Sequence, residues 1–367
     1  MKIAFHLNCL AKGGAERVVT NLAGKFADEG FDVIVATEWT DEDEYTLSPK
    51  VRRVHVGLDK EDENKGRFYK YFKRVKNLHK FMQDEKPDVV IAFARLALFR
   101  ALMAKKGTDS KVIISVRIDP YSDYVGLRNK FFIWKYMKRA DGAVFQTDYI
   151  KGFFDKQLKD KSKIILNPIT PKYIEASDIE VPKEKIIANA ARLVDFKNQV
   201  MLVHAFAIVH KKYPDYKLLI YGPDGGEGTE DRIKEAIKEE NLEGSCILMG
   251  GSDSLEKDLK KAEIFAYSSD YEGMPNALME AMALGLCCIS TDCRGGGARQ
   301  IIRNKENGLL VPVGDKDALA DGIIYLIEHK DVAQKYADNA KKIKDIASID
   351  AVYKEWNEYI REVVGKK

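Results

Sequence analysis

Cysteine is scarce in this sequence, and the few cysteines form no metal or disulfide pattern. The 367 residues contain Cys9, Cys246, Cys287, Cys288 and Cys293, with no Cys-x-x-Cys pair and no cysteine–histidine spacing of the kind that binds zinc. This spacing argues against a zinc site and against a disulfide framework. We expect the cysteines to lie in strands as small apolar residues, in a reducing cytoplasm.

A long hydrophobic run is also missing. The uncharged apolar run Ala281–Ile289 is far shorter than the ~20 residues that a membrane span needs. The N-terminal segment 1–14 contains one short apolar run, which we interpret as a first strand and not as a secretory signal. We therefore expect a cytoplasmic protein without a membrane span.

The order of the segments predicts an α/β protein of two Rossmann-like domains. Short β-branched or aromatic runs alternate with longer amphipathic segments in each half of the chain, as in βαβ units. The length also exceeds the roughly 250–300 residues that one core usually serves. The charged segment 170–185, with prolines at 171 and 182, is the predicted linker. We predict domains at residues 1–170 and 171–347, followed by an amphipathic helix at 348–367.

Positive charge is concentrated in the first half. Residues 1–170 hold 32 Lys/Arg against 23 Asp/Glu, whereas residues 171–367 hold 28 against 34. Two segments of the first half, Lys65–Lys80 and Arg128–Arg139, combine lysine and arginine with aromatic residues and contain no acid. They suit an anionic membrane surface. The alternative is a solvated basic face whose aromatic residues belong to the core; no nucleic-acid motif is present.

The first glycine-rich turn predicts an anion site. Gly13 and Gly14 lie between an expected strand and a helix, where backbone N–H groups at the helix start attract phosphate. The Gly-x-Gly-x-x-Gly pattern is absent, which disfavours dinucleotide binding. A turn that needs glycine only for steric reasons is the alternative.

Two glutamates flank a second predicted helix start. In the segment "EGMPNALMEA", Pro275 suits the first helical position, so that Glu272 precedes the helix and Glu280 lies inside it. Carboxylates accept hydrogen bonds from pairs of hydroxyl groups, and the helix start attracts an anion. This combination fits a nucleotide sugar. Alternatively, Glu280 faces solvent and Glu272 only interacts with the helix dipole.

Two basic residues follow the first predicted strand of the second domain. Arg192 and Lys197 lie in the segment "ARLVDFKNQ", at a strand end where α/β sheets bind ligands. They could neutralise a diphosphate.

These segments carry a family resemblance. "ARLVDFKNQ", "EGMPNALMEAMALG", "GGAERVVTNLA" and "LNPI" resemble the retaining GT-B glycosyltransferases of family 4 over nearly the whole chain. The resemblance implies two Rossmann-like domains that face each other across a cleft, with the C-terminal helix crossing back to the first domain.

The resemblance also implies roles for individual residues. Arg192 and Lys197 would hold the donor diphosphate, Glu280 the ribose and Glu272 the transferred sugar. The implied catalytic residues are Arg192, Lys197 and Glu272. The implied donor-binding residues are Gly13, Gly14, Arg192, Lys197, Gly251, Ser252, Glu272, Gly273, Met274, Pro275, Asn276, Ala277 and Glu280.

The chain departs from the family at one position. Many members carry a histidine after the strand that corresponds to "KVIISV", whereas this chain reads "SVRIDP". Arg117 and Asp119 are therefore candidate sugar or acceptor contacts. A structural Arg–Asp pair before Pro120 is the alternative.

The expected function is retaining transfer of a hexose or N-acetylhexosamine from a nucleotide sugar, with a UDP-sugar favoured. The expected acceptor is a lipid-linked saccharide. The expected process is the assembly of a cell-surface polysaccharide or glycan. We expect no metal and no cofactor, no nucleic-acid partner, and a peripheral place on the inner face of the plasma membrane. The alternatives are a non-catalytic scaffold of a polysaccharide assembly complex and a GT-B nucleotide-sugar epimerase.

Overall fold

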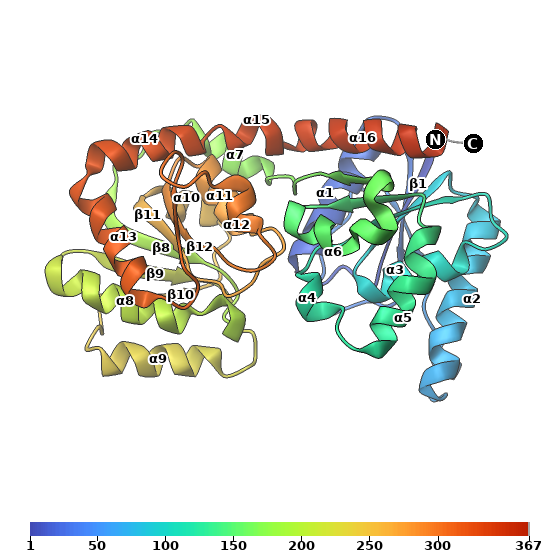
Figure 1. The fold of residues 1–367 in the computed structure, drawn as a ribbon, viewed down its shortest axis with the longest axis horizontal. Coiled ribbons are helices and arrows are strands. Elements are labelled where there is room, and N and C mark those ends of the chain that lie inside the picture. Colours follow the sequence, from blue (N-terminus) through green and yellow to red (C-terminus); the bar gives the residue numbers. More distant parts are fainter. Residues whose placement is uncertain (366–367) are drawn as a thin grey trace. The chain divides into compact units, whose positions relative to one another are not determined.

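A computed structural model describes residues 1–365 (Figure 1). The chain divides into two compact units, one formed by Met1–Pro168 together with the C-terminal segment from Ile349, the other by Ile169–Ser348. Each unit is a parallel sheet covered by helices, which confirms the predicted α/β fold with two Rossmann-like domains.

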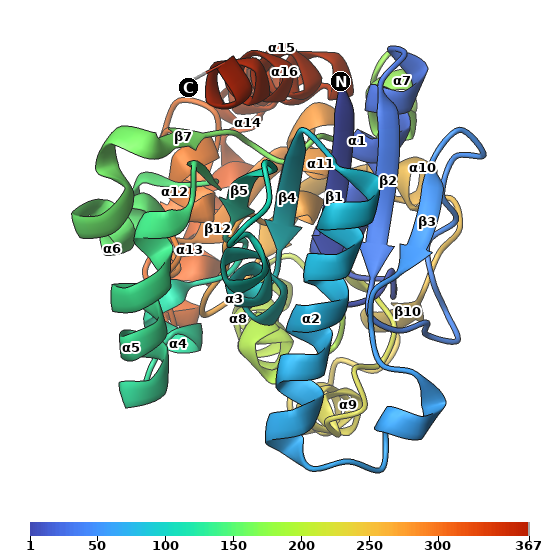
Figure 2. The same cartoon turned by 90° about the vertical axis from the view of Figure 1, so that its right-hand side faces the viewer.

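The first unit contains a seven-stranded sheet in the order β3-β2-β1-β4-β5-β6-β7 (Figure 2). Its strands are β1 (Lys2–Leu7), β2 (Asp32–Thr37), β3 (Arg52–His55), β4 (Val89–Phe93), β5 (Lys111–Ser115), β6 (Gly142–Phe145) and β7 (Ser162–Ile164). Its α-helices are α1 (Gly14–Asp28), α2 (Arg67–Glu85), α3 (Arg95–Ala104), α4 (Pro120–Asp123), α5 (Leu127–Tyr136), α6 (Asp148–Leu158) and α16 (Ile349–Gly365).

Alternate residues of each strand in this sheet pack on opposite layers. In β1, Ile3 and Phe5 face a core that includes α1 and α16, whereas Ala4 faces the core that includes α2, α3, α5 and α6. The central strands β4 and β5 are therefore apolar on both faces, as buried parallel strands are. The sequence pattern missed β3 because it is short and its residues Arg52 and Arg53 are exposed.

The C-terminal helix α16 belongs to the first unit. The predicted buried face is confirmed, and its Trp356 is fully buried and stacks on Phe93 with ring centroids 6.3 Å apart. Tyr359 donates a hydrogen bond to the Lys161 carbonyl (2.5 Å) and accepts one from the Ala143 N–H (2.9 Å). The last helix thus completes the core of a domain whose first strand begins at residue 2.

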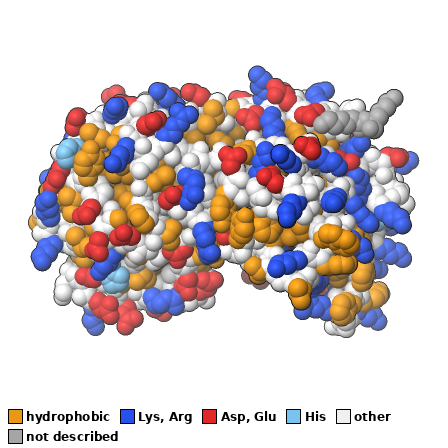
Figure 3. Space-filling model, viewed as in Figure 1, with side chains coloured by type: hydrophobic (Ala, Val, Ile, Leu, Met, Phe, Trp, Pro, Cys, Tyr) orange, Lys and Arg blue, Asp and Glu red, His pale blue; other side chains and the backbone are white. Residues whose placement is uncertain are grey.

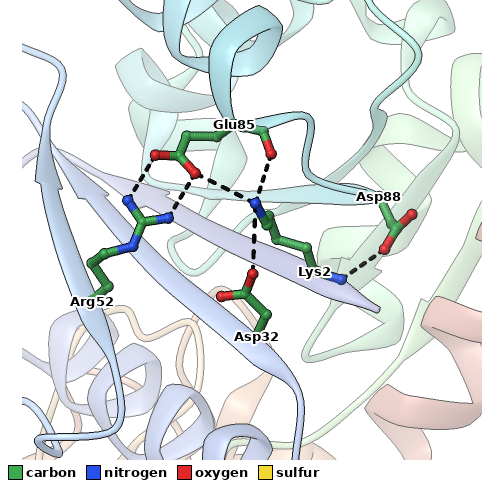
Figure 4. Close-up of polar contacts among 5 residues, drawn as sticks. All are labelled: Lys2, Asp32, Arg52, Glu85 and Asp88. Carbon is green, nitrogen blue, oxygen red and sulfur yellow. Dashed lines mark hydrogen bonds and ion pairs between the residues drawn. The ribbon is translucent and has the colours of Figure 1, made fainter.

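A charge network closes the amino edge of the same sheet (Figure 4). Arg52 donates to both carboxylate oxygens of Glu85 (2.7 and 2.6 Å), and Lys2 Nζ lies 3.5 Å from carboxylate oxygens of Glu85 and Asp32. The Lys2 N–H donates to Asp88 at 2.6 Å. The Arg52 hydrogen bond lowers the pKa of Glu85 to about 2.

The second unit contains a six-stranded sheet in the order β10-β9-β8-β11-β12-β13. Its strands are β8 (Glu184–Ala190), β9 (Lys217–Tyr221), β10 (Cys246–Gly250), β11 (Ala262–Tyr267), β12 (Cys287–Thr291) and β13 (Leu309–Val311). Its α-helices are α7 (Pro171–Ser177), α8 (Gln199–Lys212), α9 (Thr229–Glu239), α10 (Leu255–Lys260), α11 (Asn276–Ala283), α12 (Gly297–Ile301), α13 (Lys316–Glu328), α14 (Lys330–Ala340) and α15 (Ile343–Ala347).

Three local predictions were wrong. The segment 170–185 is not a plain linker, because Pro171 opens helix α7, a position that suits proline. Pro275 is the N-cap of α11 and not its first residue. Cys9 and Cys293 lie outside strands, whereas Cys246, Cys287 and Cys288 lie in them.

Candidate functional site

The second unit places its candidate residues where the strand order reverses. Strands β8 and β11 are neighbours, and the chain moves from β8 toward β9 on one side and from β11 toward β12 on the other. Arg192 and Lys197 follow the end of β8, and Glu272 follows the end of β11. Ligands of open α/β sheets bind at such a switch point, beyond the carboxyl ends of the strands.

Lys197 and Glu272 form the centre of a polar cluster. Lys197 Nζ forms a short ion pair with Glu272 Oε1 and donates to the Tyr267 hydroxyl at 2.8 Å. The same carboxylate oxygen accepts from Tyr267 (2.8 Å) and from Ser269 Oγ (3.1 Å). These interactions all involve Oε1, and no hydrogen bond or ion pair joins Oε2 of Glu272 to another described residue.

The electrostatics of the cluster keep Lys197 charged. Burial alone would lower the pKa of Lys197, but the Glu272 carboxylate and Tyr267 more than offset it, and the pKa is raised. Burial and the same carboxylate raise the pKa of Tyr267, so its hydroxyl remains a donor. Sequence reasoning missed Tyr267 and Ser269, because a buried tyrosine at a strand end looks like a core residue.

Arg192 is exposed in the loop after β8. Its carbonyl accepts from Gln199 Nε2 at 3.1 Å, and Gln199 is fully buried at the start of α8. The N-cap Asn198 has a left-handed φ of 50°, and its side chain accepts from the Met201 N–H and donates to Asp270. The loop that carries Arg192 and Lys197 is thus tied to the residues before Glu272.

The segment between Glu272 and α11 follows the predicted path. Gly273, Met274 and Pro275 are buried, and Asn276 and Ala277 begin the helix with intermediate exposure. Pro275 has an extended backbone (φ −78°, ψ 94°), and no side chain caps the helix. The N-cap residue thus provides no side-chain acceptor for the first N–H groups of α11, as an anion site at a helix start requires.

A glycine loop supports this segment from the opposite side. The Glu272 N–H donates to the Arg294 carbonyl at 2.8 Å, and the next residue, Gly295, has φ +89°. A Cβ atom on Gly295 would lie 1.8 Å from the Glu272 carbonyl oxygen. On Gly297, it would lie 2.4 Å from the Gly273 oxygen. Only glycine permits this approach, and sequence reasoning did not identify the loop.

Glu280 lies inside the unit and not on its surface. Its side chain is buried on α11, and Thr170 Oγ1 donates to Oε1 at 3.4 Å. The interpretation of Glu280 as a solvent-facing helix residue is therefore wrong. A carboxylate buried this deeply needs partners that donate hydrogen bonds.

Gly251 and Ser252 follow β10, the edge strand farthest along β8-β9-β10 from Glu272. Gly251 is exposed. The Ser252 hydroxyl donates to Asp258 (2.6 Å) and accepts from the Ser254 N–H (3.2 Å). The serine thus orders the start of α10, and its assignment to the nucleotide stays a prediction.

In the first unit, Gly13 is the N-cap of α1, a helix of 15 residues without a side-chain cap. Its backbone is extended (φ −130°), so conformational strain does not require glycine here. Gly14 is exposed. A Cβ atom on Gly13 would, however, lie 2.3 Å from Glu16 Oε2, so the steric explanation stands beside the anion site, which stays a prediction.

Arg117 and Asp119 do not form the ion pair considered above. Asp119 is fully buried and caps α4, where its oxygens accept from the Tyr121 N–H (3.0 Å) and the Ser122 hydroxyl (2.8 Å). Arg117 donates instead to Ser115 Oγ at 2.8 Å. Asp119 is thus occupied by its own helix, which disfavours a role as a sugar contact.

The basic segments of the first unit expose their aromatic residues. Phe68 and Phe72, one turn apart on α2, are 82% and 57% exposed. On α5, Leu127, Phe131 and Trp134 are 86%, 49% and 67% exposed. We term these five residues the aromatic face. Figure 3, in the view of Figure 1, shows hydrophobic side chains beside lysines and arginines at the lower right, where Figure 1 labels α2 and α5. The alternative in which the aromatic residues of both segments belong to the core is wrong for Phe68, Phe72, Phe131 and Trp134.

The two helices of the aromatic face touch each other. Tyr71 of α2 and Phe132 of α5 have ring centroids 6.3 Å apart, and the Arg128 guanidinium lies 5.8 Å from each ring. Apolar and basic groups therefore form one continuous surface. Among residues 1–365, no helix is long and apolar enough to cross a membrane.

The two Rossmann-like units, with cations after β8 and a carboxylate before α11, define the class of GT-B glycosyltransferases. Residues 12–173 match the family described as Glycosyltransferase Family 4, and residues 174–343 match Glycosyl transferases group 1. The chain belongs to the GT-B glycosyltransferases of family 4 and is therefore a glycosyltransferase.

Individual relatives agree with this family. An uncharacterized glycosyltransferase of Methanocaldococcus jannaschii is 30% identical in an alignment of length 341 that covers 78% of this chain and 82% of the relative. An α-1,4-N-acetyl-D-galactosaminyltransferase of Campylobacter jejuni, named for a saccharide acceptor on undecaprenyl diphosphate, is 27% identical over 99% of both chains.

A solved structure shows the same fold. The structure of Anabaena Alr3699/HepE in complex with UDP superposes with a TM-score of 0.79 at 18% identity, covering 99% of this chain and 100% of that chain. At this identity the likeness concerns the fold alone.

Proposed function

We propose that this protein transfers a hexose or N-acetylhexosamine from a UDP-sugar to a lipid-linked saccharide, with retention of anomeric configuration and without a metal ion. The observation that carries the proposal is the cluster of Lys197, Tyr267 and Glu272 at the switch point of the second sheet. The UDP complex of Alr3699/HepE and the acceptor in the name of the C. jejuni relative support the choice of substrates.

The charges of the cluster fit departure of a diphosphate. When the bond from the anomeric carbon to the diphosphate breaks, negative charge grows on the leaving oxygen. Lys197 and Arg192 supply fixed positive charge, and the uncapped N–H groups of α11 supply further donors. Each such donor contributes on the order of 3 kcal/mol to the stability of the transition state. A protein that supplies these charges itself does not need Mg²⁺ for this step.

The carboxylates fit the hydroxyl groups of the donor. Glu272 Oε1 is occupied by Lys197, Tyr267 and Ser269, which leaves Oε2 for hydroxyl groups of the transferred sugar. Glu280, one to two turns into α11, would accept from the ribose hydroxyls. Retention would follow if the acceptor hydroxyl attacks from the side of the departing diphosphate and gives its proton to a diphosphate oxygen.

A thermal-shift and binding series tests the donor. UDP at a hundred times its Kd should stabilise the protein by about 2.7 kcal/mol, with or without EDTA. Glu280→Gln should weaken UDP binding about tenfold, because a charged acceptor is lost, whereas Glu235→Gln on the exposed face of α9 should not. Equal affinity for UDP in all three proteins would contradict the role of Glu280.

Product analysis separates the competing functions. Release of UDP with a new α-linked product from an α-linked donor supports retaining transfer. A changed sugar configuration without an acceptor would identify an epimerase. UDP binding without turnover of any UDP-sugar, in the presence of lipid-linked saccharides, would favour a scaffold.

The proposal includes peripheral binding to an anionic membrane, where a lipid-linked acceptor lies, at the inner face of the plasma membrane. The aromatic face carries this part: Phe68 and Phe72 follow i, i+4 spacing, and Leu127, Phe131 and Trp134 follow i, i+4, i+7 spacing. Each helix thus presents an apolar stripe. Aromatic and basic side chains on one helix surface favour the boundary between lipid headgroups and acyl chains.

Sedimentation with vesicles tests this surface. Phe68→Ser, Phe72→Ser and Trp134→Ser combined should reduce binding to phosphatidylglycerol-containing vesicles at least tenfold. Ile346→Ser, on a residue 54% exposed in the second unit, is the control. Lys70→Glu with Lys76→Glu should weaken the same binding. Unchanged binding of both sets of variants would refute the membrane surface.

The charge-reversal variant avoids Arg74 for a structural reason. Arg74 Nε lies 3.3 Å from the Glu38 carboxylate, which is buried and also pairs with Arg100. A glutamate at position 74 would therefore place a second carboxylate in a buried cluster and destabilise the fold.

A further inference from the structure

Arg117 lies at the carboxyl edge of the first sheet, near the point where the strand order reverses. Arg117 lies two residues after the end of β5. The strand order reverses between β1 and β4, and β5 is the neighbour of β4. Ligands of α/β sheets gather beyond this edge. The position is also the one where the family resemblance leads us to expect histidine.

Four segments hold the Arg117 side chain in one orientation. Its guanidinium carbon lies 4.9 Å from the centre of the Phe93 ring, at the end of β4. Nε donates to Ser115 Oγ (2.8 Å), and Nη1 donates to Asn167 Oδ1. With its amide nitrogen facing the Val116 carbonyl, Gln146 accepts from Nε at 3.0 Å and from Nη1 at 3.1 Å. A side chain fixed this firmly is preorganised for a partner.

The partners of Arg117 are all neutral. Within residues 1–365 no carboxylate contacts it, and Nη2 is buried without a hydrogen-bond partner. The other arginines with buried donors in this unit differ: Arg95 lies 3.2 Å from Asp123, and Arg74 and Arg100 both contact Glu38. Burial lowers the pKa of Arg117 to about 9, which still leaves it charged at neutral pH.

An unpaired buried guanidinium is unfavourable unless something else supplies the negative charge. Asp119, the nearest carboxylate in sequence, is committed to the N-cap of α4. The missing partner is therefore not found in the described part of this domain. A guanidinium with fixed Nε and Nη1 and without a charged partner suits a planar or tetrahedral oxyanion.

We propose that Arg117 binds an oxyanion of a substrate, a phosphate or carboxylate oxygen that compensates the charge of the guanidinium. This inference rests on the proposed function, since the oxyanion would belong to the donor or to the acceptor. The diphosphate of the donor, the diphosphate of a lipid carrier and an acidic sugar share the chemistry, and the experiment separates them.

Side-chain NMR of protein labelled with ¹⁵N-arginine gives a direct test. The signals of Arg117 and Arg192 are assigned with Arg117→Lys and Arg192→Lys, and UDP, farnesyl diphosphate and glucuronate are added in separate titrations. The expected result is a saturable shift of the Arg117 signal with at least one of the three anions. That anion names the source. No shift of Arg117 with any of them would overturn the proposal.

The same spectra keep the two proposals apart. A shift of Arg192 with UDP, while Arg117 stays silent toward every anion, would support the donor site and refute the role of Arg117. The opposite pattern would refute the donor site and leave Arg117 as an anion site of the first unit.

Kinetics provide the second readout. Arg117→Gln should raise the KM of the substrate that bears the oxyanion at least tenfold, and Arg117→Lys should recover part of this loss because it keeps the charge. Arg53→Gln, at an arginine paired with Glu44, is the control. A purely structural role would instead lower the amount of folded protein in both Arg117 variants, with unchanged KM values, and would contradict the proposal.

Discussion

The hydroxyl group of Tyr267 offers the most direct test of the candidate site. Tyr267→Phe keeps the ring, which is 2% exposed and packs near Lys197, and removes one oxygen. That oxygen donates to Glu272 Oε1 and accepts from Lys197 Nζ, both at 2.8 Å. The substitution therefore leaves the direct ion pair between Lys197 and Glu272 but removes the group that orients it.

The expected loss follows from the charge on the acceptor. A hydrogen bond to a charged group contributes about 1.5–3 kcal/mol. If the oriented carboxylate and ammonium act on the transition state, kcat/KM should fall roughly 10- to 150-fold, since about 1.4 kcal/mol corresponds to a factor of ten. The assay is initial-rate UDP release in the presence of acceptor.

The same domain contains a matched control at the opposite edge of its sheet. Tyr216, also 2% exposed, donates to the Glu263 carboxylate and accepts from Lys330 Nζ at 2.8 Å. It precedes β9, so this Lys–Tyr–Glu group lies at the amino edge. Tyr216→Phe should cost similar stability and leave kcat/KM unchanged. Equal kcat/KM losses in both variants, or no loss in Tyr267→Phe, would refute the reasoning.

Two further predictions concern stability and the donor segment. Gly295→Ala should weaken UDP binding and lower the melting temperature by several degrees, because its Cβ would collide with the Glu272 carbonyl. The control is Gly226→Ala: Gly226 has a similar φ (+75°), but a Cβ atom there would have no other atom within 4 Å. This variant should retain UDP affinity. Glu85→Gln should lower the free energy of unfolding by about 1 kcal/mol at pH 7. This loss is smaller than the full pKa shift would imply, because Glu85 and Arg52 are 25% and 49% exposed and solvent screens their interaction. Since the pKa of Glu85 is lowered to about 2 in the folded protein, its contribution is complete above about pH 4.5 and lost as pH falls toward 2, so urea unfolding should show the difference shrinking over that range. A constant difference from pH 7 to pH 2, or equal UDP binding by both glycine variants, would contradict these assignments.

The sequence was most informative where periodicity reports burial. The alternation of apolar runs and amphipathic segments predicted both sheets. The spacing of Ile349, Val352, Trp356, Tyr359, Ile360 and Val363 predicted one face of α16, and all of these residues except Ile349 are buried. Strand β3 was not predicted, because an exposed edge strand with two arginines lacks this apolar pattern.

The site was less accessible to sequence reasoning, because its key contacts join residues far apart. Arg192, Lys197 and Glu272 were recognisable from local motifs, and the structure brings the last two into contact. Tyr267 and Gly295 act on Glu272 through three-dimensional packing that no local pattern reports. The roles of the predicted residues in binding remain predictions.

Arg117 and Asp119 illustrate the same limit. Two residues of opposite charge at i and i+2 suggested an ion pair, but Asp119 is the N-cap of α4, which begins at Pro120. The carboxylate then caps the helix, and the guanidinium lies on Phe93. Which of two local options a charged side chain takes depends on the direction of the following helix.

The membership of α16 in the first unit has a consequence for biosynthesis. Residues from Ile349 onward leave the ribosome after the whole of the second unit, yet Trp356 fills the core beside Phe93. During translation the first domain must therefore wait, with part of its apolar surface uncovered, until its last helix is made. Such a nascent chain is exposed to aggregation and is a natural client for chaperones.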